Sequence, residues 1–227
     1  MRVTIHQPYF MPYLGFFSKV FSSEVLVLYD SAQYVKNRLD NRNYINYKDK
    51  KTLLTIPVSK HMSFKPLSEV LISQHYDWRE THLSMLFNAY YDYKYYEIIK
   101  DDIADIYSRD YKYLSEINKV FIEKFLYLLG WSGEIVSSSS MKISQEISPS
   151  EKLLSILINT NATSYIAGPS SKKYLNINSL ESNNIKVNFH NYSNKKYMQK
   201  SKEFIPNLSI LDYIYNCGTK NFHSFIK

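Results

Sequence analysis

The sequence predicts a mixed α/β fold, in which a largely parallel sheet is flanked by helices and accompanied by a β-hairpin and a helical insert. Two nearly continuous apolar runs, Val3–Ile5 and Val25–Leu28, are separated by about eleven residues of helical pattern. A crossover of this length between two apolar strands is typical of a parallel βαβ unit. Residues 165–167 and 185–189 add strands that alternate with helical segments, which extends the same pattern.

Local signals place the connecting elements. Pro12 is well placed as the first residue of the crossover helix. A hairpin is expected over residues 44–58, with a charged turn at residues 48–51, and a short strand over residues 68–73. Ser148–Glu151 has the pattern of a capping box with proline at the first helical position, so a later helix begins there.

The helical insert is expected over roughly residues 77–130, as a subdomain of a single domain that spans residues 1–227. One helical pattern begins at Asp77, and a longer one begins near Asp110 and ends at Gly130, a residue type that favours helix C-termini. The serine run at residues 137–140 indicates a loop or hinge.

Composition narrows the class of protein. The chain has 28 basic and 21 acidic residues, and its net charge of +7 favours an anionic partner without identifying one. Its single cysteine excludes an internal disulfide framework and fits a reducing compartment. There is no signal-peptide pattern and no apolar run near the roughly 18 residues of a membrane span. We therefore expect a cytoplasmic protein without a membrane span, either monomeric or oligomeric.

Polar residues follow the first two strands at the point where each strand ends. His6 and Gln7 follow the first strand, and Tyr29 and Asp30 follow the second. In an open α/β sheet, ligands bind beyond the carboxyl ends of the strands. We therefore expect His6 to be a general base whose ring is oriented by Asp30 or Tyr29, and Gln7 to hold a ligand. The alternative for His6 is a hydrogen-bonded histidine with a structural role only.

The loop at residues 36–43 contains two arginines, one lysine and three asparagines. Guanidinium groups bind phosphate or carboxylate in a bidentate manner, and asparagine amides can stabilise an oxyanion. Arg42, with Asn41 and Asn43, is therefore expected to stabilise charge or bind phosphate, assisted by Lys36. The alternative is an ordinary solvated turn.

Three other features carry weaker signals. His82 shares a helical face with Trp78, a setting in which histidine is more often a core residue than a catalyst. Gly168 begins a Gly-Pro-Ser-Ser-Lys-Lys segment that is a candidate phosphate cradle at a helix start. A helix dipole opposes a thiolate at Cys217, so no nucleophilic role is expected there. The six histidines lack metal-ligand spacing, and neither a metal nor another cofactor is expected.

These segments together resemble the WbqC-like protein family, in order over nearly the whole chain. The matching segments are residues 6–17, Tyr29-Asp30, Gln33-Tyr34, Lys36, Asn41-Arg42-Asn43, Ile56-Pro57-Val58, Trp78, His82, residues 165–168, Tyr197, Gln199 and residues 204–212. The family often has an aromatic residue and a small turn where this chain has residues 37–40, a departure that bears on the substrate more than on the fold.

Such proteins look like products of bacterial O-antigen and other surface-polysaccharide gene clusters. The resemblance implies an acyl- or aminoacyltransferase, with glycine as one candidate group, that forms an amide on a nucleotide-linked amino sugar in lipopolysaccharide or other polysaccharide synthesis. The donor is a thioester, an adenylate or an aminoacyl-tRNA. The residues expected at the site are His6, Asp30 and Arg42 as catalytic groups and Gln7, Tyr9, Tyr13, Lys36, Asn41, Asn43, Trp78, His82, Gly168 and Gln199 as substrate-binding groups.

Two alternatives remain open. One is a binding or scaffold protein of polysaccharide assembly that docks partner enzymes through tyrosine-rich surfaces. The other is a nucleotide-binding, adenylyl-forming enzyme, because the strand, the loop with His6 and proline and the following helix loosely resemble nucleotidylyltransferases and pantothenate synthetase. In this chain the downstream histidine partner of that loop is replaced by Gly15-Phe16.

Overall fold

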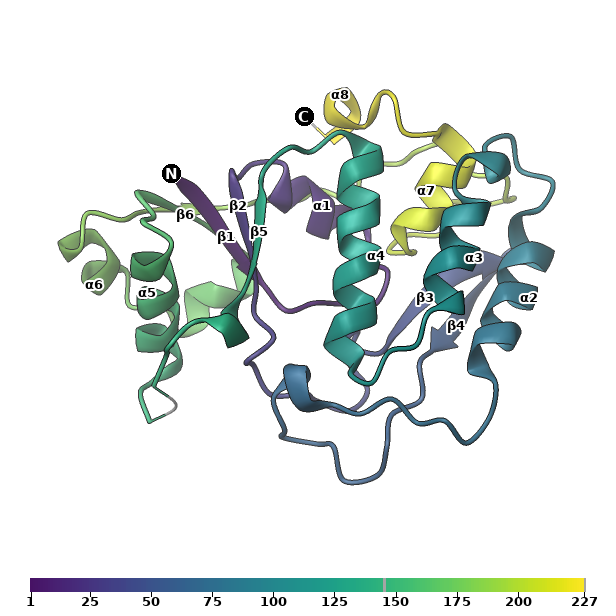
Figure 1. Cartoon of the computed structure of the whole chain (residues 1–227). Coiled ribbons are helices and arrows are strands. Elements are labelled where there is room, and N and C mark those ends of the chain that lie inside the picture. The colour runs from purple at the N-terminus through teal and green to yellow at the C-terminus, as the bar shows by residue number, and fades with distance from the viewer. Residues whose placement is uncertain (145, 227) are drawn as a thin grey trace.

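Five parallel strands form the central sheet of the computed structural model, which describes residues 1–144 and 146–226 (Figure 1). The order across the sheet is β5-β2-β1-β6-β7. The predicted βαβ unit is confirmed, because β1 and β2 pair in parallel with Val3 opposite Val25 and α1 between them. The bounds are β1 (Arg2–His6), α1 (Leu14–Val20), β2 (Val25–Leu28), β5 (Glu134–Ser137), β6 (Ser164–Ala167) and β7 (Lys186–Phe189).

Helices cover both faces of this sheet. Side chains alternate between the faces along a strand, so Val25 and Val27 of β2 join one buried cluster and Leu26 and Leu28 the other. The first cluster includes α5 (Pro149–Asn159) and α6 (Ile177–Ser182), and the second includes α1 and α4 (Leu114–Leu129). Burial on both faces explains why β2 is a continuous apolar run.

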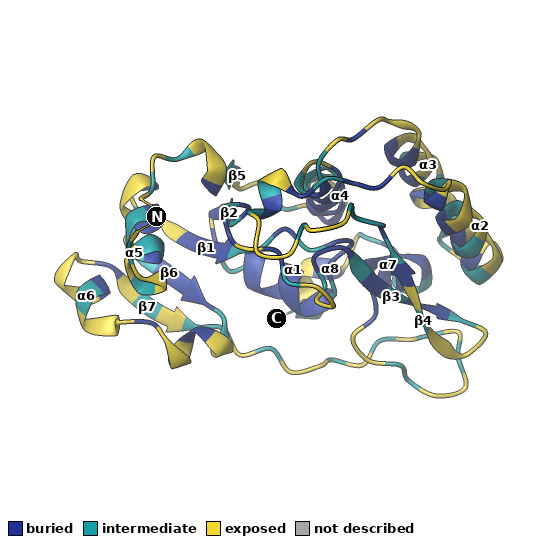
Figure 2. Cartoon of the chain, turned by 90° about the horizontal axis from the view of Figure 1, so that it is seen from below, coloured by how far each residue is buried: buried dark blue, intermediate teal, exposed yellow. Residues whose placement is uncertain are grey.

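The remaining elements lie beyond α4, in a region that we call the hairpin half (Figure 1). It comprises the antiparallel pair of β3 (Arg42–Tyr47) and β4 (Lys50–Thr55) with α2 (Trp78–Tyr90), α3 (Lys100–Ser108) and α7 (Ile210–Cys217). The short α8 (Phe222–Ile226) follows. The buried cluster around α1 and α4 continues into these helices. Figure 2 shows exposed outward faces on α2 and α3, whereas α7 has no exposed residue.

Several local predictions are confirmed. Ser148 and Glu151 form the reciprocal capping box, and Pro149 is the first residue of α5. Gly130 ends α4 with a φ of 84°, a conformation that favours glycine. The crossover helix begins at Leu14 instead of Pro12, because Tyr13 is still extended and pairs with Ser209.

One predicted strand is absent, and the prediction for the serine run holds only in part. Residues 68–73 do not form a strand, because the buried side chains Val70 and Ile72 pack in the core while only single bridges, Val58 to Ile72 and Leu71 to Tyr113, pair the backbone. The serine run, for which a loop or hinge is predicted, is divided between a strand end and a turn. Ser137 ends β5, an edge strand that the sequence analysis missed, and the next residues form a 3-10 turn fastened by the Asp30 carboxylate.

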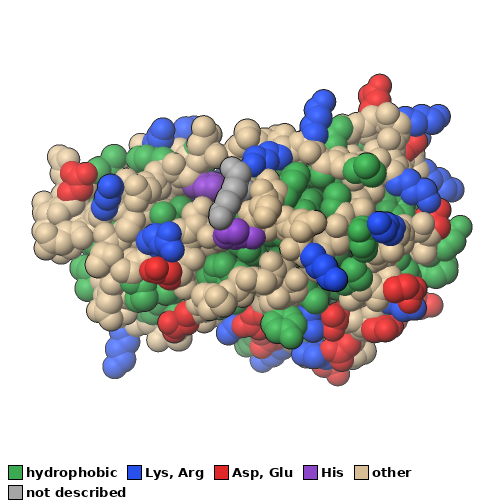
Figure 3. All heavy atoms as spheres, turned by 90° about the horizontal axis from the view of Figure 1, so that it is seen from above, with side chains coloured by type: hydrophobic (Ala, Val, Ile, Leu, Met, Phe, Trp, Pro, Cys, Tyr) green, Lys and Arg blue, Asp and Glu red, His purple; other side chains and the backbone are tan. Residues whose placement is uncertain are grey.

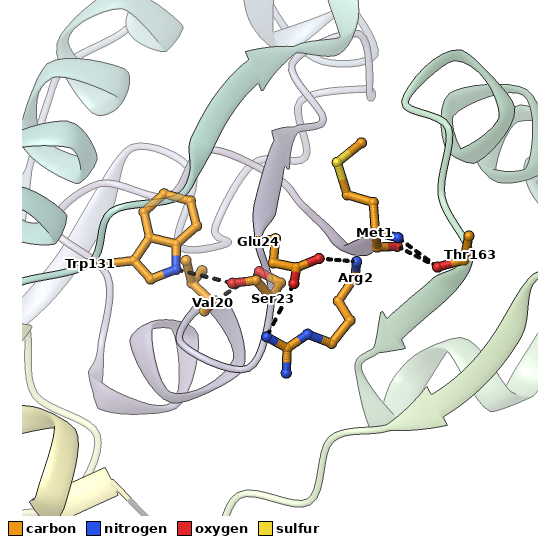
Figure 4. Close-up of polar contacts among 7 residues, drawn as sticks. All are labelled: Met1, Arg2, Val20, Ser23, Glu24, Trp131 and Thr163. Carbon is orange, nitrogen blue, oxygen red and sulfur yellow. Dashed lines mark hydrogen bonds and ion pairs between the residues drawn. The ribbon is translucent and has the colours of Figure 1, made fainter.

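The amino edge of the sheet is closed by hydrogen bonds (Figure 4). The amide of Arg2 donates to the carboxylate of Glu24 at 2.8 Å, and the N-terminal amine donates to Thr163 Oγ1 at 2.6 Å. The indole of Trp131 donates to the carbonyl of Ser23. These contacts join the strands at the end opposite to the functional site.

Candidate functional site

A cleft of about 760 Å³ opens at the carboxyl edge of the sheet, between β1 and β6. The chain turns from β1 to β2 on one side of β1 and later adds β6 and β7 on the other, so the strand order reverses between β1 and β6. Open α/β sheets bind ligands at this point of reversal. His6 follows β1, Gly168 follows β6 and His190 follows β7, and all three line the cleft.

His6 is half-buried in the cleft wall as a neutral imidazole. Its Nδ1–H donates to the carbonyl of Gln7 at 2.8 Å, which leaves Nε2 as the acceptor. The ring meets the edges of Tyr9 and Phe16 at centroid distances of 4.6 and 4.8 Å. Burial, reinforced by the nearby Lys19, lowers the pKa of His6 to about 3. His6 therefore accepts a hydrogen bond well but is a weak proton acceptor.

Lys19 of α1 lies inside the same cleft and is only 6 % exposed. Its Nζ donates to the carbonyl of Ile5 at 3.0 Å. Burial lowers the pKa of Lys19 to about 7. Burial, and after it the charge of Lys19, also lowers the pKa of His6 and of His190. The Nε2 atom of His190 is buried and has no hydrogen-bond partner among the described residues.

The lining of the cleft is cationic and aromatic. The exposed side chains of Arg38 and Lys173 stand at its rim, and Lys19 lies deeper. No aspartate or glutamate is among the described lining residues. Six tyrosines contribute to the walls, namely Tyr9, Tyr13, Tyr29, Tyr165, Tyr174 and Tyr192. Such a surface favours an anionic ligand that also carries flat or ring-shaped groups.

Gly15 allows two of these tyrosines to approach α1. A Cβ at this position would lie 2.4 Å from the ring of Tyr13 and 2.8 Å from the ring of Tyr192. Both rings would have to shift, and both line the cleft, so glycine here sets the shape of one wall. At Gly168 an added Cβ would meet nothing within 4 Å, which leaves that side of the cleft open.

The structure brings five of the predicted site residues together. His6, Gln7, Tyr9, Tyr13 and Gly168 all line the cleft. They come from the loop after β1, from the N-terminus of α1 and from the end of β6, which are distant in sequence and meet at the reversal point.

Asp30 does not join them, and its expected contact with His6 is absent. Its carboxylate accepts hydrogen bonds from Ser138 Oγ at 3.0 Å and from the amide and hydroxyl of Ser139 at 2.8 and 2.6 Å. Asp30 lines a separate cavity of about 230 Å³ at the ends of β2 and β5. The segment of residues 6–9 separates the two cavities, because its residue Pro8 faces the smaller one.

The predicted site residues in the loop after β2 do not lie together. Lys36 is exposed, and Arg42 donates to Asn37 Oδ1 at the surface, and neither lines the cleft. Asn41 is buried, donates to the carbonyl of Ile56 and accepts from the hydroxyl of Tyr34. Of residues 36–43 only Arg38 lines the cleft, and Tyr29, directly after β2, lines it as well.

Four other predicted residues are used by the fold. Asn43 donates to the carbonyls of Phe10 and Met11, which fixes the loop that carries Tyr9. Trp78 is fully buried, and His82 bonds both ring nitrogens, to the hydroxyl of Tyr107 and the carbonyl of Thr55. Gln199 joins Tyr197 and Asp212 in a buried network. None of the four lines the cleft, so Trp78 does not form its wall.

Lys19 and His190 line the cleft but were not predicted from the sequence as site residues, whereas Arg38 and Lys173 belong to the two predicted phosphate-binding segments, residues 36–43 and 168–173. His190 directly follows β7, so the rule that selected His6 would also have selected it. Helical periodicity places Lys19 on a polar face, and only the packing of α1 on all sides shows that this residue is buried.

Within residues 1–144 and 146–226, no three His, Cys, Asp or Glu side chains are grouped closely enough to hold a metal ion. In the same residues, no helix has the length and apolar character to cross a membrane.

Comparisons with known proteins identify a family. The model of the WbqC-like protein family matches residues 7–224. An uncharacterized protein of Mycobacterium tuberculosis (strain ATCC 25618 / H37Rv), Rv1507c, is 28% identical over 222 residues, which cover 96% of this chain and 95% of that protein. No solved structure gives a significant match. The chain belongs to the WbqC-like protein family.

Proposed function

We propose that the protein is an acyl- or aminoacyltransferase that forms an amide on a nucleotide-linked amino sugar, in the synthesis of O-antigen or another surface polysaccharide. The observation that carries this proposal is the cleft at the strand-order reversal, which is lined by cations and tyrosines and by no described carboxylate. This lining is complementary to a diphosphate joined to a base and a sugar.

The rim cations are suited to the diphosphate. Arg38 and Lys173 reach the cleft from different elements, one from the loop after β2 and one from the turn after β6. Both are exposed in the free protein, so a phosphate group can reach them without displacing a packed side chain. A guanidinium and an ammonium at this position would hold the diphosphate and leave the sugar to enter the deeper part.

The deeper part is suited to an amino sugar and an acyl group. His6 offers Nε2 as an acceptor for a hydroxyl or amine N–H of the sugar, and Gln7 supplies an amide beside it. Tyr9 and Tyr13 supply flat faces and hydroxyl groups. Tyrosine, histidine and amide groups bind a sugar ring without requiring charge on it.

A transfer assay tests the proposal. The protein is incubated with a nucleotide-linked 4-amino sugar and, in separate arms, a glycyl or acetyl thioester, a glycyl adenylate or glycyl-tRNA, and the sugar nucleotide is examined for the mass of the added group. The matched control is the same sugar nucleotide with a hydroxyl in place of the amine, on which no amide can form. Clear binding of the amino sugar with no product from any donor would refute transfer.

The same assay separates the rivals. Release of pyrophosphate from ATP in the presence of a carboxylic acid or amino acid would identify an adenylyl-forming enzyme. A scaffold protein would give neither product nor pyrophosphate. In a deletion strain, loss of one sugar substituent from an otherwise complete polysaccharide supports the transferase, and a defect of chain assembly supports the scaffold.

On the face drawn in Figure 3, basic side chains are scattered among acidic ones, so no continuous basic stripe for tRNA appears there.

A further inference from the structure

Lys19 is a buried cation without a counter-ion. Its side chain is 6 % exposed, and none of the ion pairs among the described residues includes it. Its Nζ makes one hydrogen bond, to the carbonyl of Ile5, whereas an ammonium group can make three. Lysine is almost never fully buried unless it is paired, because desolvation of the charge is unfavourable. Burial of Lys19 is therefore not explained by a contribution to the stability of the fold, and a functional role would explain it.

The surroundings of Lys19 lie inside the cleft. His6 at the end of β1 and His190 after β7 are the titratable groups whose pKa values Lys19 lowers. Arg38 and Lys173 line the same cavity nearer the rim, and no described carboxylate lines it. The charged side chains among the described lining residues are thus all cations, and none of them offers Lys19 a counter-ion.

We propose that Lys19 is the catalytic base of the transfer, and that its buried amine accepts the proton released by the attacking amine of the amino sugar. This inference rests on the proposed function. It moves the role of base from His6 to Lys19 and leaves His6 as a hydrogen-bond acceptor that positions the sugar.

The neutral amine of the sugar attacks the carbonyl carbon of the activated donor, and a C–N bond forms. The C–S or C–O bond to the leaving group breaks, and the electron pair departs with the thiolate, phosphate or tRNA hydroxyl oxygen. Lys19 Nζ takes one proton from the attacking nitrogen and becomes an ammonium. It then gives that proton to the leaving group or to water, and the amine is restored.

Proton affinity supports this assignment. Burial lowers the pKa of Lys19 to about 7, so the neutral amine is populated at neutral pH. A base is most effective when its pKa lies near the working pH. The pKa of His6 falls to about 3, which makes its imidazole a far weaker base in the same cleft.

The first measurement needs no activity. The whole protein is labelled with carbon-13 at the lysine ε carbons, and the Lys19 signal is assigned from its loss in Lys19→Arg. We expect this signal to titrate between about pH 6 and pH 8, well below the ordinary range of a lysine amine. A Lys19 amine that stays charged up to pH 9 would overturn the inference and leave the proposed function standing.

The second measurement follows transfer. We expect Lys19→Arg and Lys19→Met to lose at least about 100-fold in kcat, with Kd for the sugar nucleotide changed less than about 3-fold. In Lys19→Ala, added propylamine should restore part of the rate, which a merely structural role would not explain. Lys172→Arg is the matched control. If wild-type protein transfers and Lys19→Arg does so equally well, Lys19 is not the base. If wild-type protein binds the sugar nucleotide and transfers nothing, both proposals fail.

Discussion

The carboxyl edge of the sheet and the hairpin half contain the same kinds of polar side chain but use them differently. In the hairpin half, His82 bonds through both ring nitrogens, and the Asp212 carboxylate accepts from Tyr90, Tyr197 and Gln199. In the cleft, His190 Nε2 has no partner among the described residues, and Lys19 makes a single hydrogen bond. Polar groups satisfied by the chain itself serve the fold, and those left incomplete beside open space are available to a ligand.

The lack of a partner alone does not mark a site. The indole nitrogen of Trp78 is also buried without a partner in the described residues, but it lies in a packed core and lines no described cavity. The informative combination is an incomplete polar group together with a cavity. Lys19 and His190 meet both conditions, in the same cleft.

The largest expected effect concerns the hairpin half. Asp212→Ala removes a fully buried carboxylate, leaves the hydroxyls of Tyr90 and Tyr197 without their acceptor, and takes one of several acceptors from the amide of Gln199. We expect the free energy of unfolding, measured with urea, to fall by about 3 kcal/mol. The matched control is Asp105→Ala, whose carboxylate pairs with Arg109 at the surface and whose loss should cost no more than about 0.5 kcal/mol. Equal effects of the two changes would remove the distinction between the regions.

At the carboxyl edge the expected sign is reversed. Lys19→Met replaces an unpaired buried cation by an apolar side chain of similar length, so the free energy of unfolding at pH 7 should rise by about 2 kcal/mol while transfer is lost. The pKa of Lys19 is about 7 in the folded protein and has its ordinary value of 10.5 in the unfolded chain.

The unfolded chain therefore binds more protons between pH 7 and pH 10.5, and wild-type stability gains from this group as the pH rises. Urea unfolding of both proteins from pH 6 to pH 9 should show the advantage of Lys19→Met largest at pH 7 and below and shrinking above it. A variant less stable than wild type at every pH would mean that Lys19 supports the fold.

The strands of the sheet and the polar residues at their ends show what the sequence could predict. The βαβ unit was accessible because strands buried on both faces form continuous apolar runs. His6 and Gln7 were accessible because they follow such a run directly. The pairing of β6 with the other side of β1 could not be predicted from the sequence. β6 comes from about 160 residues later in the chain, and no local pattern states which strand it joins.

Asp30 was misplaced for that reason. The polar ends of β1 and β2 are adjacent, but the strand order reverses on the far side of β1, so the cleft forms toward β6. The asparagines of the Asn41-Arg42-Asn43 motif were misjudged for another reason. An asparagine that binds backbone carbonyls and one that binds a ligand have the same sequence signal, and only Asn43's contacts with Phe10 and Met11 distinguish them.

Asp30→Asn tests this correction with an intermediate effect. The change weakens three hydrogen bonds that fasten the turn after β5, so the free energy of unfolding should fall by about 1 kcal/mol. Because Asp30 faces the smaller cavity, Kd for a sugar nucleotide should stay within about 2-fold of wild type, by calorimetry. A loss of affinity beyond 10-fold at unchanged stability would restore Asp30 to the ligand site.

The smallest expected effect gives the sharpest comparison, because it uses two adjacent lysines. Lys172 and Lys173 are both exposed, but Lys173 lines the cleft while Lys172 lies over the ring of Phe189 at 4.8 Å. An exposed cation adds a modest, salt-dependent attraction to a bound phosphate, so Lys173→Ala should weaken binding of a nucleoside diphosphate about 5-fold and lower its salt dependence. Lys172→Ala should change Kd less than 2-fold, and neither change should alter the free energy of unfolding by more than about 0.5 kcal/mol. If the two variants lost affinity equally, the attraction would come from the net charge of the protein and the position of Lys173 would contribute nothing.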